Sequence, residues 1–318
     1  MYPNKLKYTI YAITIVFGFI LVIQSYFIYN LHQRPSSSSI QADTLINKSS
    51  ENNTSSKKIL LSPMPSKMDF CGEVVPLSDP EIFERMEFEW ISAQNRHTAN
   101  WIILNRSTRY FPIIEPILKR NNVPDDFKYL AVAESNLANV VSPSNAEGFW
   151  QFLAPTGAAF GLEISKTVDE RYDVAKATEA ACKYLLAAHG MFNSWTLAAA
   201  SYNMGQGGLS DEMNLQRQED YYKLRLNSET SKYLFRIITW KYIIGNPSSI
   251  GMEWNPDMGQ KMPSTKSVKI NQSINDLVDW SIAQGTDYRM VRYLNPWLRG
   301  NSLDVTSGKT FDILLPLN

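Results

Sequence analysis

The chain has 318 residues, of which 44% are hydrophobic and 12% aromatic, enough to build a folded core. Its 31 basic residues balance 31 acidic ones, so the chain lacks the basic charge that marks a nucleic-acid-binding protein. The two cysteines, Cys71 and Cys182, are too few for a disulfide framework and lack the spacing of metal ligands. They can pair with each other or stay free, and the sequence leaves both states open.

An uncharged segment near the N-terminus predicts a membrane helix. From Tyr8 to Leu31 no residue carries a formal charge, and about 20 apolar residues suffice to span a bilayer. Lys5 and Lys7 precede the segment, which favours a cytoplasmic N-terminus. A cleaved signal peptide is the alternative, but the bulky residues from Gln24 to Tyr29 and the lack of an Ala-x-Ala site favour an uncleaved anchor. We therefore expect residues 1–34 to be a cytoplasmic stub and anchor, with the remainder exported.

A polar segment separates this anchor from the folded part. Residues 35–67 open with Pro35 and four serines, and the stretch from Asn47 to Ser56 is almost entirely polar. Such a composition buries too little apolar surface to offset chain entropy. We expect a flexible linker that holds a domain away from the membrane.

From about residue 70 the apolar residues recur at helical spacing. The sequence Ser78-Asp79-Pro80-Glu81 predicts a capping box at the start of the first helix. Asp173 is expected to cap a strongly helical segment that follows it. The further expected helices cover residues 97–110, 113–119, 174–192, 195–203 and 228–242.

A short helix carries the most informative residue, Glu134. Pro124, followed by two acidic residues, marks the helix start. From Phe127 the helical spacing leads through Leu130 and Ala131 to Glu134, which places a carboxylate on an apolar face. Burial raises the pKa of such a carboxyl group, as a general acid requires. A paired, purely structural glutamate is the alternative that this helix alone leaves open.

Three further motifs follow Glu134-Ser135 along the chain. They are Gly148-Phe149-Trp150-Gln151, Ser201-Tyr202-Asn203-Met204-Gly205 and Glu229-Thr230-Ser231-Lys232-Tyr233. In order and spacing the four motifs resemble the lytic transglycosylases of the soluble-lytic-transglycosylase type, glycoside hydrolase family 23. The detailed resemblance runs from about Val123 to Arg236, and Ser201 stands where the family usually has alanine.

The resemblance implies a mostly α, lysozyme-like catalytic domain over residues 68–245, with its core at 123–236 and Glu134 as the catalytic acid. Aromatic faces suit sugar rings, and side-chain amides suit N-acetyl groups. Trp150 and Tyr202 also fit plain core positions, and Glu229 fits a helix N-terminal acid. The residues expected to bind substrate are Ser135, Ser142, Gly148, Phe149, Trp150, Gln151, Tyr202, Asn203, Glu229 and Tyr233.

The resemblance also implies a substrate and a place of action. The substrate is the glycan strand of peptidoglycan, cut between N-acetylmuramic acid and N-acetylglucosamine with a 1,6-anhydromuramyl product. No metal or organic cofactor is implied. The anchor would hold the enzyme at the inner membrane of a bacterial envelope, with the catalytic domain in the periplasm. The alternatives are a hydrolase that uses a second carboxylate, such as Glu147 or Asp173, and a non-catalytic wall-binding protein.

After a predicted linker at residues 246–264, the C-terminal region is predicted to form a small α+β unit over residues 265–318. A strand over 266–270, helices over 274–283 and 288–294, and a strand over 311–315 are expected. The unit resembles a divergent LysM module, a peptidoglycan-binding unit, in this order and in Leu294-Asn295-Pro296. Asn271-Gln272-Ser273 replaces the usual Gly-Asp-Thr start, so glycan binding and simple packing onto the catalytic domain both stay open.

Overall fold

The structure is a computed structural model that describes residues 61–317. The predicted anchor, residues 1–34, and most of the predicted linker lie outside this part of the chain. Within residues 61–317, no helix combines the length and the apolar composition needed to cross a bilayer.

The end of the predicted linker packs on the folded domain. Trp90 Nε1 donates to the Ser62 carbonyl at 3.0 Å, and the Ser62 amide donates to Gln94 Oε1 at 2.7 Å. Met64 also packs against the main core. The packed region therefore includes residues ahead of the predicted boundary at residue 68.

A short antiparallel hairpin comes first in the helical domain, formed by β1 (Asp69–Phe70) and β2 (Glu73–Val74). The sequence did not predict it, because two residues per strand show no alternation. Helix α2 (Pro80–Gln94) follows, and its N-cap is Asp79 rather than Ser78. The Asp79 side chain accepts from the first free amides, since Pro80 occupies the first helical position.

One long helix, α3 (His97–Arg120), replaces the two shorter helices predicted for this stretch. Pro112 and Pro116 lie inside it, where each is expected to cost about 3 kcal/mol. The helix continues because its apolar face stays buried along its length, from Leu104 to Leu118. Tertiary packing therefore outweighs the local proline penalty.

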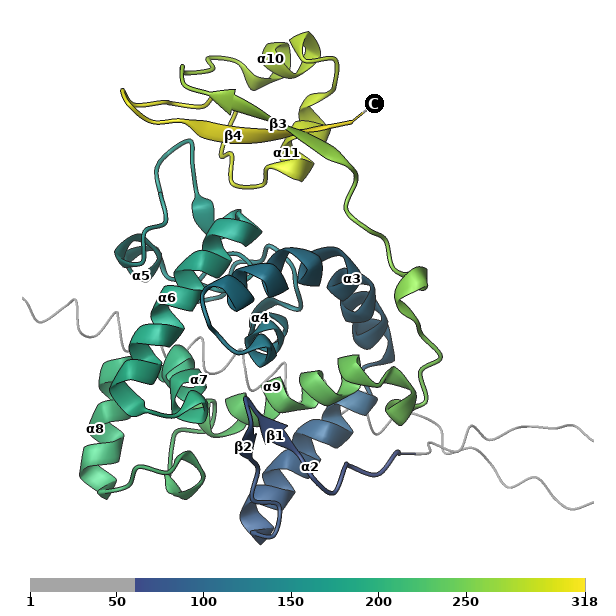
Figure 1. Ribbon diagram of the computed structural model, residues 1–318, viewed down its shortest axis with the longest axis vertical. Helices are drawn as coiled ribbons and strands as arrows, with labels where there is room; N and C mark the ends of the chain where they lie inside the picture. Colours follow the sequence, from purple (N-terminus) through teal and green to yellow (C-terminus); the bar gives the residue numbers. More distant parts are fainter. Residues whose placement is uncertain (1–60, 318) are drawn as a thin grey trace, which may run out of the picture. The chain divides into compact units, whose positions relative to one another are not determined.

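Six α-helices make up the rest of the domain within residues 61–317. They are α4 (Lys128–Ser135), α5 (Ala154–Ala159), α6 (Val174–Phe192), α7 (Trp195–Met204), α8 (Gln206–Gln216) and α9 (Thr230–Gly245), and α4, α7 and α9 among them carry predicted motifs. The predicted bounds of α6 are confirmed, as is its Asp173 cap, which accepts from the Lys176 amide. Helix α9 packs against both α4 and α7, and α4 also contacts α3 (Figure 1). Two motif-bearing helices are thus gathered around a third, α9.

The C-terminal module, residues 265–317, has the predicted order strand, helix, helix, strand. Strand β3 (Thr265–Ile270) pairs antiparallel with β4 (Phe311–Pro316) (Figure 1). Helices α10 (Leu277–Ala283) and α11 (Tyr288–Leu294) lie between them in sequence. Helix α10 begins later than the predicted residue 274, because Asp276 caps it.

The module shares its core with the helical domain. Val168 and Tyr172, from the loop before α6, are buried in the same apolar cluster as the module residues. The Asp169 amide donates to the Trp297 carbonyl at 2.8 Å. A fragment consisting only of residues 265–318 would therefore lack part of this core.

Both cysteines are free, which settles the question that the sequence left open. Cys182 is fully buried inside α6, and burial raises the pKa of its thiol to about 12. Cys71 lies in the turn of the hairpin, with a left-handed φ of 53°. Neither thiol is a thiolate near neutral pH, so neither is a ready nucleophile.

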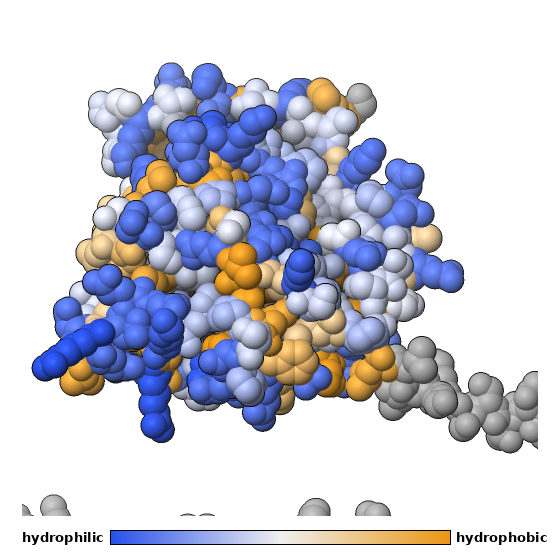
Figure 2. Space-filling view, turned by 60° about the horizontal axis from the view of Figure 1, so that its bottom comes forward, coloured by the Kyte–Doolittle hydropathy of each residue, from blue (hydrophilic) through white to orange (hydrophobic). Residues whose placement is uncertain are grey.

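Large apolar side chains also reach the surface. On the face drawn in Figure 2 they form patches between hydrophilic side chains. Val74 and Leu215 are among the most exposed in residues 61–317, at 74% and 78%. Exposed apolar residues of this kind are common on folded proteins and carry no functional argument alone.

Candidate active site

Glu134 lies in the last turn of α4, a short helix that is fixed by its buried face. Leu130, Ala131 and Val132 have no exposed surface. The helix ends at Asn136, whose left-handed φ of 51° turns the chain away. The Glu134 side chain is half-buried. A carboxyl group is thus held at the end of a rigid element, where an approaching ligand can reach it.

Tyr233 of α9 holds this carboxyl group in place. Its hydroxyl donates a hydrogen bond to Glu134 Oε1, although the two residues are 99 positions apart in sequence. The tyrosine is 2% exposed. Burial raises the pKa of Tyr233 well above its ordinary value, so the hydroxyl remains a donor across the neutral range.

The apolar surroundings change the acidity of Glu134. Burial raises its pKa from about 4.5 to about 7, and the Tyr233 hydrogen bond and the charge of Arg236 oppose this rise. Glu229 adds to it, but Glu229 is paired with Arg236 at 3.2 Å. Near neutral pH, Glu134 is therefore divided between acid and carboxylate. This state suits a group that must donate a proton and then accept one.

The raised pKa also makes the stability of the fold depend on pH. The folded protein holds the Glu134 proton more tightly than the unfolded chain, so the free energy of unfolding should fall as pH rises from about 4.5 to about 7. Because the carboxyl group is partly exposed, we expect a loss on the order of 1 kcal/mol. Urea unfolding of the full chain at pH 5 and pH 8 measures it, and Glu134→Gln should lack this contribution. Identical pH dependence in both proteins would contradict the shift.

Helix α7 brings a second tyrosine beside Glu134. The Tyr202 hydroxyl donates to the Trp150 carbonyl at 2.8 Å. Burial, and then the negative charge of Glu134, raise the pKa of Tyr202 well above its ordinary value. The next residue, Asn203, accepts through Oδ1 from Thr230 Oγ1 of α9 at 2.7 Å. The Tyr-Asn motif is thus tied to the same helix that carries Tyr233.

The loop that carries the Gly148–Gln151 motif has a backbone that few residues allow. Gly148 has a φ of +82°, and a Cβ there would lie 1.9 Å from the Arg171 carbonyl oxygen. Gln151 is left-handed as well, with a φ of 50°. Its Nε2 donates to the carbonyls of Val140 and Gly148 at 3.0 and 2.8 Å. A non-glycine residue at positive φ is strained, so the surrounding contacts must hold the loop in this shape.

Two residues of this motif point into the core. Phe149 and Trp150 are 2% and 0% exposed. Trp150 Nε1 donates to Thr178 Oγ1 of α6 at 2.9 Å. The core interpretation that the sequence left open for Trp150 is what the structure shows, so the indole fixes the loop and presents no face to a ligand.

The other predicted binding residues lie in simpler surroundings. Ser135 Oγ donates to the Ala131 carbonyl at 3.1 Å, and Ser142 Oγ accepts from the Ala146 amide at 3.0 Å. Both serines therefore shape the backbone around Glu134 and the loop. The Glu229 side chain is 61% exposed at the start of α9, as expected of a helix N-terminal acid.

Arg171 is a buried cation behind the loop, and the sequence analysis did not identify it. Its guanidinium donates to both Asp169 oxygens, at 3.0 and 2.7 Å, and lies 3.1 Å from Glu147 Oε1. Its Nη1 also donates to the carbonyls of Asn145 and Phe152, at 3.4 and 3.3 Å. One side chain thus holds both ends of the loop and neutralises Glu147.

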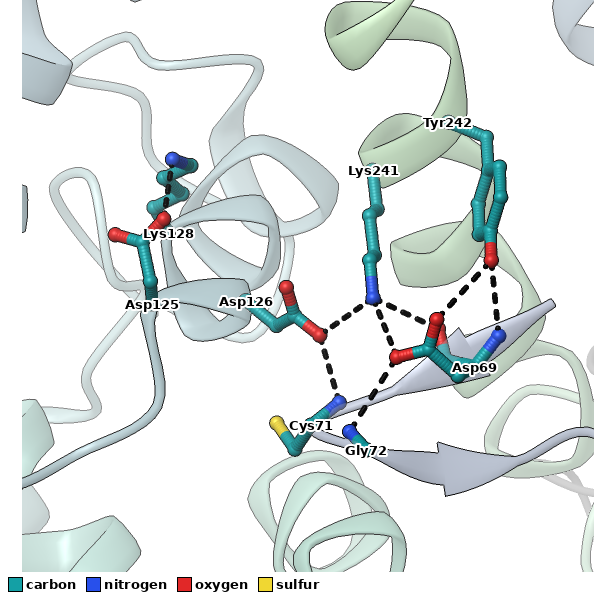
Figure 3. A network of polar contacts seen from close by, with 8 residues as sticks. All are labelled: Asp69, Cys71, Gly72, Asp125, Asp126, Lys128, Lys241 and Tyr242. Carbon is teal, nitrogen blue, oxygen red and sulfur yellow. Dashed lines mark hydrogen bonds and ion pairs between the residues drawn. The ribbon is translucent and has the colours of Figure 1, made fainter.

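Lys241 of α9 clamps the hairpin to the start of α4. Its Nζ lies 2.7 Å from Asp69 Oδ2 on β1 and 2.8 Å from Asp126 Oδ2 (Figure 3). Asp126 belongs to the 3-10 turn η1 (Asp125–Phe127) that leads into α4, and it also accepts from the Cys71 amide at 2.6 Å. The network fixes the two helices that carry Glu134 and Tyr233 relative to each other.

Glu73 on β2 ties the hairpin to the start of α7. Its carboxylate accepts from the amides of Trp195 and Thr196, at 2.6 and 3.0 Å. These are free amides at a helix N-terminus, where the helix dipole favours a negative charge. The hairpin therefore contacts α7, α9 and the turn η1 that leads into α4, the elements that position Tyr202, Tyr233 and Glu134.

Comparisons with known proteins match two regions of the chain to families. Residues 111–225 match the model of the transglycosylase SLT domain, and residues 266–318 match that of the soluble lytic transglycosylase C-terminal LysM-like domain. The chain therefore combines an SLT domain, with its lysozyme-like helical fold, and a LysM-like C-terminal domain.

At the level of individual proteins, the chain is similar to Membrane-bound lytic murein transglycosylase D of Escherichia coli strain K12 and of Escherichia coli O6:H1 strain CFT073. Each match is 27% identical over 189 residues. The matches cover 58% of this chain and 42% of each relative. The matched region thus spans about two fifths of the relatives' own length.

Proposed function

We propose that the chain is a peptidoglycan lytic transglycosylase, which cleaves the β-1,4 bond between N-acetylmuramic acid and N-acetylglucosamine without water. The observation that carries the proposal is Glu134, a carboxyl group with a pKa of about 7 that Tyr233 holds in place. The SLT domain match and the similarity to lytic murein transglycosylase D support it.

In the first step, protonated Glu134 gives its proton to the bridging oxygen. The bond from this oxygen to the muramyl anomeric carbon breaks, and its electron pair leaves with the N-acetylglucosamine oxygen. Positive charge develops on the anomeric carbon, as in other glycosidic cleavages. The substrate's own 2-acetamido group stabilises it, and Tyr202 positions that group.

In the second step, ionised Glu134 takes the proton of the muramyl 6-hydroxyl. The freed oxygen pair closes on the anomeric carbon, which gives the 1,6-anhydro ring and restores the acid. The Tyr233 hydrogen bond stabilises the carboxylate between the steps. Every proton is accounted for without water, so one carboxyl group with a pKa near the working pH suffices.

Within residues 61–317, the two acids that could serve as a second carboxylate of a hydrolase, Glu147 and Asp173, are both engaged elsewhere. Ordinary glycosidases use two, about 5–5.5 Å or about 6.5–9.5 Å apart. Of the two acids considered, Glu147 faces the Arg171 guanidinium, and Asp173 caps α6. Both are engaged in structural contacts, which favours the one-carboxyl mechanism.

We propose that the remaining motif residues shape the sugar groove. Gln151 and Asn203 offer amide groups to N-acetyl substituents. Gly148 allows the loop to approach closely. The other residues act through the groove's framework: Ser135, Ser142, Phe149 and Trp150 hold backbone or core, and Glu229 pairs with Arg236.

We also propose that residues 1–34 anchor the protein in the inner membrane of a bacterial envelope, with the SLT domain in the periplasm. The uncharged stretch from Tyr8 to Leu31 supports this location. So does the word "membrane-bound" in the names of the relatives. Peptidoglycan lies in the same compartment.

The pKa of Glu134 predicts the pH profile of cleavage. The rate should fall about tenfold per pH unit above pH 7, because ionised Glu134 cannot donate the first proton. In Tyr233→Phe the carboxylate loses a stabilising hydrogen bond, so the Glu134 pKa rises and the alkaline limb moves to higher pH. The measurement is kcat/KM on soluble glycan strands from pH 5 to pH 9.

A matched control for Tyr233→Phe is Tyr222→Phe. The buried Tyr222 hydroxyl has no hydrogen-bond partner among the described residues. We expect its removal to leave the alkaline limb in place. An unshifted limb in Tyr233→Phe would show that the phenol does not set the acidity of Glu134.

The masses of the products test the proposed reaction. Peptidoglycan digested with the full chain should yield muramyl ends that are lighter by one water than hydrolysed ends. Reducing ends of full mass would identify a muramidase. Uncut strands that nevertheless retain the protein would identify a wall-binding protein.

A further inference from the structure

A large cavity lies where the helical domain meets the C-terminal module. Its volume is about 1020 Å³, the size of a site for a drug-sized ligand. Residues of α3 and of the loop after α4 line one side, and residues of α11 and β4 line the other. Glu134, Gln151, Tyr202 and Tyr233 do not line it, so it is distinct from the candidate active site.

The helical domain and the module that border this cavity contact each other directly. The Arg299 amide donates to the Thr167 carbonyl at 2.8 Å, and the Arg299 guanidinium lies 4.2 Å from the centre of the Tyr172 ring. Arg109 of α3 donates to the Tyr293 hydroxyl of α11 at 3.2 Å. The cavity is therefore bounded by contacting surfaces and needs no closure to form.

Positive charge gathers in the cavity although the chain as a whole is neutral. Five basic side chains line it, against two acidic ones. Four of the five, Arg106, Arg109, Lys261 and Arg292, form no ion pair with any carboxylate in residues 61–317. The hydrogen bonds of the three arginines go to neutral oxygens. The Arg292 Nε is buried and has no hydrogen-bond partner among the described residues.

The two acidic side chains in the lining are already engaged. Asp173 accepts from the Lys176 amide as the cap of α6, and Asp312 lies 3.2 Å from Lys269 Nζ. A concave site lined by one sign of charge concentrates ions of the opposite sign. The cavity is therefore suited to an anion rather than to a neutral sugar.

Apolar side chains form the rest of the wall. They include Ile113 of α3 and Val174 of α6, both partly exposed, and the almost fully buried Leu137 and Phe149 beside the candidate active site. Trp297 and Leu294 face them from the module. The preferred ligand therefore combines carboxylates, which suit arginine and lysine, with small apolar groups.

We propose that this cavity binds the stem peptide of peptidoglycan through its carboxylates. Stem peptides carry free carboxylates beside short apolar side chains, and this is the chemistry that the lining matches. The choice of this peptide rests on the proposed function, whereas the site's preference for anions rests on the charges alone. Peptide-bearing strands would thus be recognised at a second point, next to the elements that carry Glu134 and Gln151.

Calorimetric titration of the full chain tests the proposal. The probe is sugar-free stem peptide, released from peptidoglycan by an amidase. We expect binding that weakens at least tenfold in Arg109→Gln/Lys261→Gln and also weakens as salt is added. The same peptide with its carboxylates converted to amides should not bind.

Matched controls keep the result interpretable. Lys119→Gln/Lys266→Gln removes the same charge from exposed positions outside the cavity and should bind as the parent does. If the first variant melts at a lower temperature than the parent, Lys261→Gln alone replaces it, since Lys261 is exposed. This single change should still weaken binding several-fold.

Parallel digestion of glycan strands stripped of peptides separates the two proposals. If the protein cuts the strands but does not bind the peptide, the peptide site is wrong and the proposed reaction stands. The same conclusion follows if amidation of the peptide, or the double substitution in the cavity, leaves peptide binding unchanged while the strands are still cut. Carboxylate-dependent binding without any cleavage would overturn the proposed function and leave an anion site.

Discussion

Glu134→Gln is expected to lower the rate of peptidoglycan cleavage by about 1,000-fold. Proton transfer by one positioned group contributes roughly 10²–10⁴-fold, and here both chemical steps pass through the same carboxyl group. Glutamine has nearly the same shape and its carbonyl can still accept from Tyr233, so the fold should persist. Release of soluble fragments, measured with the full chain, gives the rates.

The control for this substitution is Glu84→Gln, at an exposed position of α2 that forms no ion pair in residues 61–317. It should cleave at the parent rate. Urea unfolding of both variants at pH 5 should give the parent's stability. If Glu134→Gln keeps more than about a tenth of the activity while Glu84→Gln behaves normally, another group donates the proton.

Arg171→Met is expected to destabilise the protein by about 3–5 kcal/mol. The substitution removes the cation from a buried cluster and leaves Asp169, 8% exposed, and Glu147 without their partner. It also removes the hydrogen bonds to the carbonyls of Asn145 and Phe152. The loop that carries Gly148 and Gln151 should loosen, so KM for glycan strands should rise more than kcat falls.

Lys309→Met supplies the comparison, because it breaks an ion pair with Glu163 in which the lysine side chain is 51% exposed. Exposed pairs contribute about 0–1 kcal/mol, so little change is expected. Urea unfolding of the two variants measures the loss of stability, and steady-state kinetics measure the changes in KM and kcat. A loss below about 1 kcal/mol in Arg171→Met would mean that the cluster is not what holds the loop.

Much of the fold follows from local signals in the sequence. Helix α6 and its Asp173 cap were predictable because alanine-rich periodicity and a capping acid agree. The strand, helix, helix, strand order of the module was predictable for similar reasons. Helix α3 is continuous because burial along its whole face outweighs the cost of Pro112 and Pro116. Burial is not visible in the local sequence, so two helices were predicted there.

In the candidate site, too, single residues were predictable from local motifs, whereas the contacts between them were not. Glu134 and Tyr233 were predictable from motifs, but their hydrogen bond joins α4 to α9 across 99 residues and needed the structure. The Lys241 clamp and the Arg171 cluster were missed, because each depends on pairing between distant or loop segments. A run of three charged residues just before the Asp173 cap was the one local signal for Arg171.

Digestion of peptidoglycan by the full chain in water enriched in heavy oxygen tests the central claim most directly. If Glu134 serves as acid and then base while the muramyl 6-hydroxyl closes the ring, no oxygen from water enters the product. The new muramyl ends should therefore carry no heavy oxygen and retain the anhydro mass. One heavy oxygen at each new end would show that water attacks the anomeric carbon, and would contradict the one-carboxyl transglycosylase mechanism.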